Sequence, residues 1–114
     1  MVASLVDALQ RLGANRVEAL LIAHLVSHGT ARTKQIMEAT DLRQPEVSVG
    51  MRTLRERGWV ETEPVPREGK GRPMHAYRLA TDRSALASYY ATRGEAEVAS
   101  YREAIDSVRR ELMA

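Results

Sequence analysis

The sequence predicts a mainly α-helical domain that carries one small β-hairpin, in the α+β class. Three observations support this fold class. Apolar residues recur every three or four positions along most of the chain, as on the buried face of a helix. Segments 59–63 and 74–79 alternate apolar and polar residues as strands do, and a Gly- and Pro-rich loop over 64–73 joins them. With 114 residues the chain has the size of one domain.

The N-terminal part predicts two helices. Segment 2–12 has leucines at helical spacing, namely Leu5, Leu9 and Leu12. Gly13 ends this helix, and Asn15 stands three residues before Glu18 in a capping-box arrangement. The helix that follows, at about 16–28, is apolar around most of its circumference. We therefore expect it to be buried between other elements.

The middle of the chain predicts two further helices with a tight turn between them. The first covers about 33–40, and residues 41–44 form the turn. Pro45 suits the first position of the second helix, which runs to Arg57 and is ended by Gly58. One face of this second helix is apolar and is expected to dock on the core: Val47, Met51 and Leu54.

From residue 81 to the C-terminus the chain is predicted to be helical, with a weak point at Gly94. This segment carries an apolar seam in steps of three and four residues: Val98, Tyr101, Ile105, Val108 and Leu112. The earlier turns of the same seam are small, at Ala87, Ala91 and Gly94, and small residues let two helices approach closely. We divide the single domain into an N-terminal helix (1–14), a core (15–80) and a C-terminal helix (81–114).

The helix-turn-helix over 33–60 and the hairpin over 59–79 together resemble the winged-helix transcription regulators of the MarR and TrmB type. The resemblance covers about residues 15–80, and its best stretch is 42–60 (LRQPEVSVGMRTLRERGWV). In that stretch a capped helix closes with a basic residue, Gly and a hydrophobic pair. The resemblance implies a winged helix-turn-helix that binds double-stranded DNA, regulates transcription and is not an enzyme.

Helix 45–57 is predicted to enter the major groove with the face opposite its apolar side. Arg52 can fork onto a guanine, Val49 can touch a thymine methyl, and Ser48 can reach a base or a phosphate. The wing loop 66–73 is predicted to reach the minor groove or the backbone, because Lys70-Gly71-Arg72-Pro73 resembles the core of minor-groove AT-hooks. The predicted DNA contacts are Arg32, Thr33, Lys34, Arg43, Gln44, Pro45, Ser48, Val49, Arg52, Arg67, Lys70 and Arg72.

We expect a homodimer, because an operator with two-fold symmetry needs two reading heads. The first and last helices are predicted to form the interface, through Leu5, Leu9, Leu12, Val98, Tyr101, Ile105, Val108 and Leu112. Packing of these residues within one chain is the alternative. An unknown small-molecule effector between the helical dimer layer and the DNA-binding part is a further potential partner.

Charge and composition narrow the function. The net charge is +2, and residues 31–80 carry an excess of three basic residues, so an anionic partner is expected there. The chain has no cysteine, which excludes disulfides and thiol chemistry, and no catalytic motif is present. His24 and His28 have metal-ligand spacing but no third ligand nearby, so neither a metal nor a cofactor is expected. The sequence also predicts no signal peptide and no membrane span, and hence a cytoplasmic, nucleoid-associated protein.

Two other functions stay open. A winged-helix module that docks proteins without reading DNA would show carboxylates interrupting the positive face, at Glu46, Glu56, Glu61 and Glu63. RNA binding by the wing ranks last, because the basic region lacks the usual aromatic platform.

Overall fold

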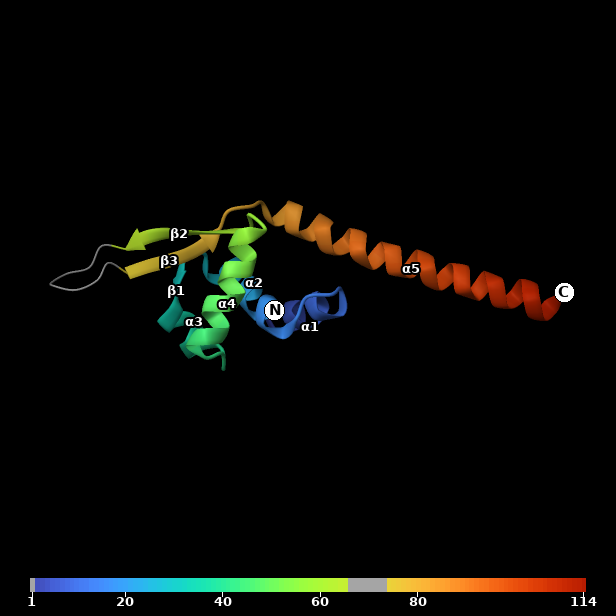
Figure 1. Ribbon diagram of the computed structural model, residues 1–114, viewed down its shortest axis with the longest axis horizontal. Coiled ribbons are helices and arrows are strands. Elements are labelled where there is room, and N and C mark those ends of the chain that lie inside the picture. Colours follow the sequence, from blue (N-terminus) through green and yellow to red (C-terminus); the bar gives the residue numbers. More distant parts are fainter. Residues whose placement is uncertain (1, 66–73) are drawn as a thin grey trace.

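The computed structural model describes residues 2–65 and 74–114. Helices α1 to α4 gather into one body, from which the β-hairpin projects on one side and α5 on the other (Figure 1). The fold is a winged helix-turn-helix, as predicted. Its elements are α1 (Val2–Arg11), α2 (Arg16–His28), β1 (Ala31–Arg32), α3 (Thr33–Ala39), α4 (Gln44–Glu56), β2 (Val60–Val65), β3 (Met74–Leu79) and α5 (Arg83–Met113).

The sheet confirms the predicted hairpin and adds a strand that the sequence did not predict. Strands β2 and β3 pair antiparallel, and β1 pairs with the other side of β3, in the order β1-β3-β2. The placement of residues 64 and 65 in an irregular loop was wrong, since Pro64 pairs with His75 and Val65 with Met74. Proline is tolerated there because β2 is an edge strand, where a missing N–H costs no ladder bond.

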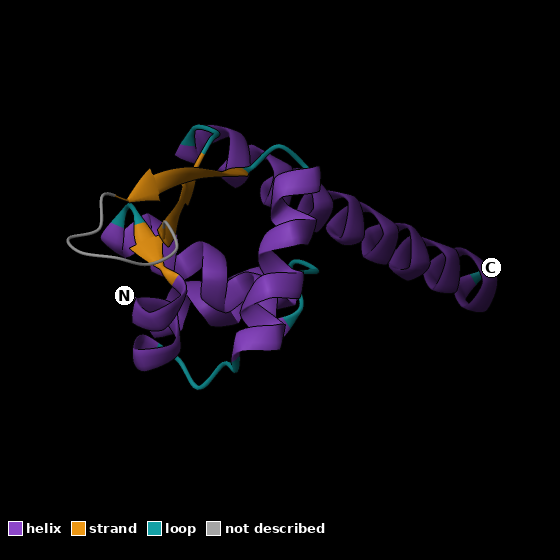
Figure 2. Cartoon of the chain, turned by 60° about the vertical axis from the view of Figure 1, so that its left-hand side comes forward, coloured by secondary structure: helices purple, strands orange, loops and turns teal. Residues whose placement is uncertain are grey.

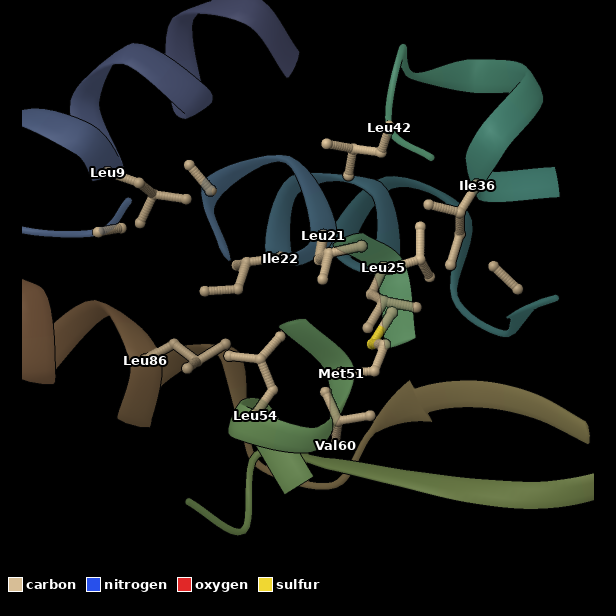
Figure 3. Close-up of a cluster of buried hydrophobic side chains, with 14 of the residues drawn as sticks. Leu9, Leu21, Ile22, Leu25, Ile36, Leu42, Met51, Leu54, Val60 and Leu86 are labelled. Carbon is tan, nitrogen blue, oxygen red and sulfur yellow. The ribbon is translucent and has the colours of Figure 1, made fainter. Parts of the chain in front are cut away.

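The core is built around α2, which packs against α1, α4 and the sheet. The largest fully buried side chains come from α2, α3 and α4: Leu21, Leu25, Ile36, Met51, Leu54 and Val47. Figure 3 shows leucines of α2 lying between Leu9 of α1, Ile36 of α3 and Leu54 of α4. The predicted docking face of the second middle helix is thus confirmed, because Val47, Met51 and Leu54 are all buried.

A close approach between α2 and α4 depends on Gly50. A Cβ atom at this position would lie 2.6 Å from Leu21 Cδ1 and 2.8 Å from Val17 Cγ1. Real Cβ atoms do not come so near to other carbons, so a side chain here would push α4 away from α2. Gly50 therefore fixes how α4 sits on the body.

Helix α5 is far longer than its contact with the body. Leu86 and Tyr90, in its first turns, are buried. The helix then continues away from the body, which gives the molecule extents of 77 × 25 × 24 Å (Figure 1). Gly94 was expected to be a weak point, but the helix runs through it without a break, and Leu12 packs over it.

Candidate nucleic-acid interface

The turn between α3 and α4 is held by its own side chains. The hydroxyl of Thr40 donates to the carbonyl oxygen of Ile36 at 2.7 Å and accepts from the amide of Leu42 at 3.2 Å. Leu42 is buried, and the Arg16 guanidinium binds the Asp41 carboxylate from the start of α2. This hydrogen bond lowers the pKa of Asp41. The turn is therefore anchored to the body on two sides.

Helix α4 begins at Gln44, one residue earlier than predicted, and ends at Glu56 rather than Arg57. The Glu46 carboxylate accepts a hydrogen bond from the Arg43 amide at 3.0 Å and so caps the first turn. Pro45 follows Gln44, where the absent N–H costs no intrahelical bond. Glu46 thus has a structural task at its own helix terminus, which accounts for a carboxylate in this otherwise basic segment.

The exposed surface of α4 has two flanks. At about 100° per residue, one flank carries four exposed polar side chains in steps of four, four and three residues: Gln44, Ser48, Arg52 and Arg55. We call these four residues the polar flank. Three of them were predicted to contact DNA, and Arg55 was missed, although its spacing of three from Arg52 is visible in the sequence. Figure 2 shows the strands on one side of the helical body and the long C-terminal helix leaving it on the other.

The other flank of α4 borders a hollow beside the N-terminus of α2. Pro45, Val49 and Thr53 line it together with residues 15–18, and its volume is about 580 Å³. Val49 is 56% exposed there. Pro45 and Val49, two of the predicted DNA contacts, therefore line this hollow, and the helical spacing places them next to Arg52 at the border of the two flanks.

Arg43 stands at the start of α4, and the remaining predicted contacts fall at two places. Arg32, Thr33 and Lys34 stand at the junction of β1 and α3, where the Arg32 amide donates to Gln35 Oε1 at 2.8 Å. Lys34 is exposed, whereas Arg32 and Thr33 are half-buried. The predicted wing contacts lie outside the described residues: Arg67, Lys70 and Arg72.

Two of the carboxylates that counted against DNA binding are paired. On the wing strands, Arg78 contacts Glu61, and its Nε atom lies 3.7 Å from Glu63 Oε2. Such exposed pairs add little stability, but Arg78 offsets one of the two negative charges on the wing strands. Glu56, at the end of α4, is exposed.

An ion pair with a buried carboxylate holds the C-terminal end of α4. The Arg57 guanidinium donates to both carboxylate oxygens of Glu18, at 3.0 and 3.3 Å, and the Glu18 side chain is only 9% exposed. The same guanidinium lies 5.1 Å from the ring centre of Trp59. The predicted cap of α2 is half confirmed: Asn15 Oδ1 accepts from the Glu18 amide at 2.8 Å, but the Glu18 carboxylate binds Arg57 instead of returning to Asn15.

An aromatic cluster joins this end of α4 to α5. Trp59 meets Tyr89 edge to face, with ring centres 4.9 Å apart, and Tyr90 lies against both rings. Tyr90 is buried, and its hydroxyl has no hydrogen-bond partner among the described residues. Burial raises the pKa of this hydroxyl. Tyr89 and Tyr90 therefore serve packing, whereas Tyr101 is 74% exposed.

His24 and His28 stack on one another, with ring centres 4.2 Å apart. His28 Nδ1 donates to the carbonyl oxygen of His24 at 3.1 Å. Burial lowers the pKa of His24, and the neighbouring His28 lowers it further. Residues 2–65 and 74–114 contain no group of three side chains suited to holding a metal ion. Over the same residues no helix is long and apolar enough to cross a bilayer.

The residues predicted to form the dimer interface fall into two groups. Leu9 is part of the core of its own chain, and Leu5 and Leu12 pack against that core. The residues on α5 are exposed by 40 to 76%: Val98, Tyr101, Ile105, Val108 and Leu112. The dimer itself stays a prediction.

Comparisons with known proteins agree with this geometry. The sequence profile of the MarR family matches residues 4–71, more than half of the chain. Among solved structures, the archaeal chromatin protein TrmBL2, described as showing a novel mode of DNA binding, is similar in fold with a TM-score of 0.58 and 19% identity. The match covers 98% of this chain and 40% of TrmBL2, so the chain spans about two fifths of that protein's length. No curated protein matches significantly. The helix-turn-helix, the wing and the profile match together show that the chain belongs to the MarR family of DNA-binding, non-enzymatic transcription regulators.

Proposed function

We propose that this protein binds specific sequences of double-stranded DNA as a homodimer. Bound at a promoter, it regulates transcription by occlusion or by recruitment. The observation that carries the proposal is the polar flank of α4. It presents two arginines and two hydrogen-bonding side chains to solvent, while the apolar face of the same helix is buried in the core. A recognition helix needs these two faces.

Within this proposal α4 lies in the major groove. Arg52 and Arg55 each offer a planar fork that fits guanine O6 and N7 or a backbone phosphate. Ser48 and Gln44, nearer the start of the helix, reach base edges or phosphates. The DNA backbone beside α4 would be contacted by Arg32, Lys34 and Arg43.

The proposal also assigns the wing to the adjacent minor groove or backbone. This assignment rests on the sequence of residues 66–73, with Arg67, Lys70 and Arg72 as the contacts. The paired carboxylates on the wing strands support it, because they leave less unbalanced negative charge next to the DNA. A DNA-bound protein of this kind would be found with the nucleoid in the cytoplasm.

The body supports the proposal by fixing the angle of α4. The helix is held at its start by the anchored turn, at its middle by Gly50 and at its end by the Arg57–Glu18 pair. A reading helix that is rigid before binding loses less entropy when it meets DNA. The three contacts come from α2 and from the turn, so the same body positions every residue of the polar flank.

The test is to recover genomic fragments bound by the purified protein and to sequence them. Arg52→Ala is the test variant, and Arg110→Ala on the far part of α5 is the matched control with the same loss of charge. The proposal expects a shared, roughly palindromic motif with wild type and Arg110→Ala, and loss of the motif with Arg52→Ala. Recovery without a motif would indicate phosphate contacts alone. No recovery at low salt would favour the protein-docking alternative.

A further inference from the structure

The outer part of α5 exposes a row of large apolar residues that the body does not cover. Val98, Tyr101 and Leu112 are 54%, 74% and 76% exposed, and Ile105 and Val108 lie between them on the same side. A helix of this length gains most of its stability from packing, so a bare apolar stripe of five residues calls for a covering partner.

The spacing of the seam positions along α5 is the same in both directions. Its positions are 87, 91, 94, 98, 101, 105, 108 and 112, and they mirror one another about the midpoint between Ala99 and Ser100. Two copies of α5 laid antiparallel about that midpoint therefore bring every seam position of one copy opposite a seam position of the other. This is the layer pattern that antiparallel helix pairs use.

The facing residues also match in size. The pairs are Ala87 with Leu112, Ala91 with Val108, Gly94 with Ile105 and Val98 with Tyr101. In every pair the smaller residue lies on the half of α5 nearer the body, and the larger one lies on the outer half. A parallel pair would instead set Gly94 against Gly94 and Tyr101 against Tyr101, which leaves gaps at one end and crowding at the other.

The body offers space for the outer half of a second α5. An apolar groove of about 340 Å³ lies between α1 and the first turns of α5, with Ala87 and Ala91 on one wall and Leu5 and Leu12 on the other. A second hollow follows along α5 past Gly94 to Ile105. In the antiparallel register, Leu112 and Val108 of the second copy reach the first groove, and Ile105 lies against Leu12, which covers Gly94 of its own chain.

Charges beside the seam agree with the same register. Glu95 and Arg102 follow seam positions 94 and 101 on the same side of the helix. In the antiparallel pair Glu95 of each copy falls beside Arg102 of the other, which gives two opposite-charge contacts by symmetry. In a parallel pair, each of these residues would lie at the same level as its own copy.

We propose that two copies of this chain pair through antiparallel α5 helices centred between Ala99 and Ser100, with the outer half of each helix seated in the α1–α5 groove of the other. The inference rests on the proposed function only in assuming a homodimer, and it specifies that dimer's geometry. Leu86 of one copy then lies opposite Met113 of the other, so the two bodies stand about 40 Å apart along the helix axis.

The absence of cysteine from the chain makes a direct test available. The test protein carries Ala91→Cys together with Val108→Cys in the full chain. Within one straight helix these two positions are about 26 Å apart, so they cannot link inside a chain. Each single variant is prepared as well, and Ala96→Cys with Glu103→Cys is the control, because this pair mirrors about the same midpoint but lies on the opposite side of α5. Mild oxidation and a short bismaleimide serve as cross-linkers.

The proposal expects a covalent dimer from the double variant and from an equimolar mixture of the two single variants, and none from either single variant alone or from the control pair. Linking of either single variant alone would show a parallel pair and overturn the proposal. A dimer in sedimentation that no variant cross-links would place the interface elsewhere. A monomer at tens of micromolar would refute both this register and the homodimer. DNA recovery is measured on the same protein, so a failure of DNA binding is seen separately.

Discussion

Removing the guanidinium of Arg57 should destabilise the protein far more than most surface substitutions do. Arg57 lies at the end of α4, and its side chain is 37% exposed, but its partner Glu18 is buried. In Arg57→Ala the Glu18 carboxylate loses both side-chain hydrogen bonds and stays within the body. The perturbation therefore reports on a buried charge rather than on a surface ion pair.

The magnitude follows from two contributions and from the partial exposure of Arg57. Leaving a buried charge without its partner costs about 3–5 kcal/mol in well-buried pairs. The partial exposure of Arg57 favours the lower end of that range. The lost contact with the Trp59 ring adds about 0.5–1 kcal/mol. We expect the free energy of unfolding to fall by about 3–4 kcal/mol in Arg57→Ala, and by less in the double variant Glu18→Gln with Arg57→Ala, which removes the unpaired charge.

Urea denaturation of wild type, both single variants and the double variant gives the coupling energy of the pair. Arg57→Lys is the matched control: it keeps the positive charge but loses the fork, so it should lie between wild type and Arg57→Ala. A loss below about 1 kcal/mol in Arg57→Ala, with no coupling to Glu18, would place the pair among ordinary surface contacts and refute the reasoning.

Three further predictions address the histidine pair, the α2–α4 contact and α5. Because burial lowers the pKa of His24 below its ordinary 6.5, the unfolded chain takes up a proton first as the pH falls. The contribution of His24 to the free energy of unfolding should thus be constant above pH 6.5 and should decrease as the pH is lowered below 6.5. Denaturation curves between pH 7.5 and 5 should show that His24→Gln removes this contribution. Gly50→Ala gains about 1 kcal/mol of helix propensity but overpacks Leu21 and Val17 at about 1–3 kcal/mol, so thermal denaturation should show a net loss of about 1 kcal/mol; a net gain would mean that the helices can separate freely. Glu95→Arg should raise the dimer dissociation constant measured by sedimentation several-fold. Adding Arg102→Glu should bring this constant back to the wild-type value, and failure to do so would count against the antiparallel register.

Much of the fold was predictable because it depends on patterns of residues that are close together in the sequence. The spacing of Val47, Met51 and Leu54 gave the buried face of α4, and Asn15 gave the start of α2. Glycines at 13, 29 and 58 come directly after helices. Each has a positive φ, at which residues with a Cβ are strained. Each of these signals depends on residues within a few positions of one another.

The features that were missed depend on contacts between distant segments. β1 has only two residues, too few for any alternation, and it is a strand only because β3 lies beside it. Pro64 is allowed in β2 only because that strand is at the edge. Gly50 looked like any helical glycine until Leu21 and Val17 were placed against it, and Glu18 binds a partner 39 positions away.

The candidate site was predicted in part for the same reason. The exposed side of α4 follows from its buried side, so Gln44, Ser48 and Arg52 could be named from the sequence. The division of that surface into a polar flank and a flank beside α2 could not, because it requires the position of α2. Arg55 could also have been named from the sequence, because its spacing of three from Arg52 places it on the same side of the helix.

The central claim is that the polar flank of α4 reads DNA sequence. The most direct measurement is the affinity of the purified protein for a fragment carrying its enriched motif and for a scrambled fragment of equal length, by fluorescence anisotropy at two salt concentrations. Our account predicts that Arg52→Ala and Arg55→Ala lose about 1–3 kcal/mol of the preference for the motif, while Arg110→Ala keeps all of it. Equal losses in all three variants, or a preference unchanged in both α4 variants, would contradict the account.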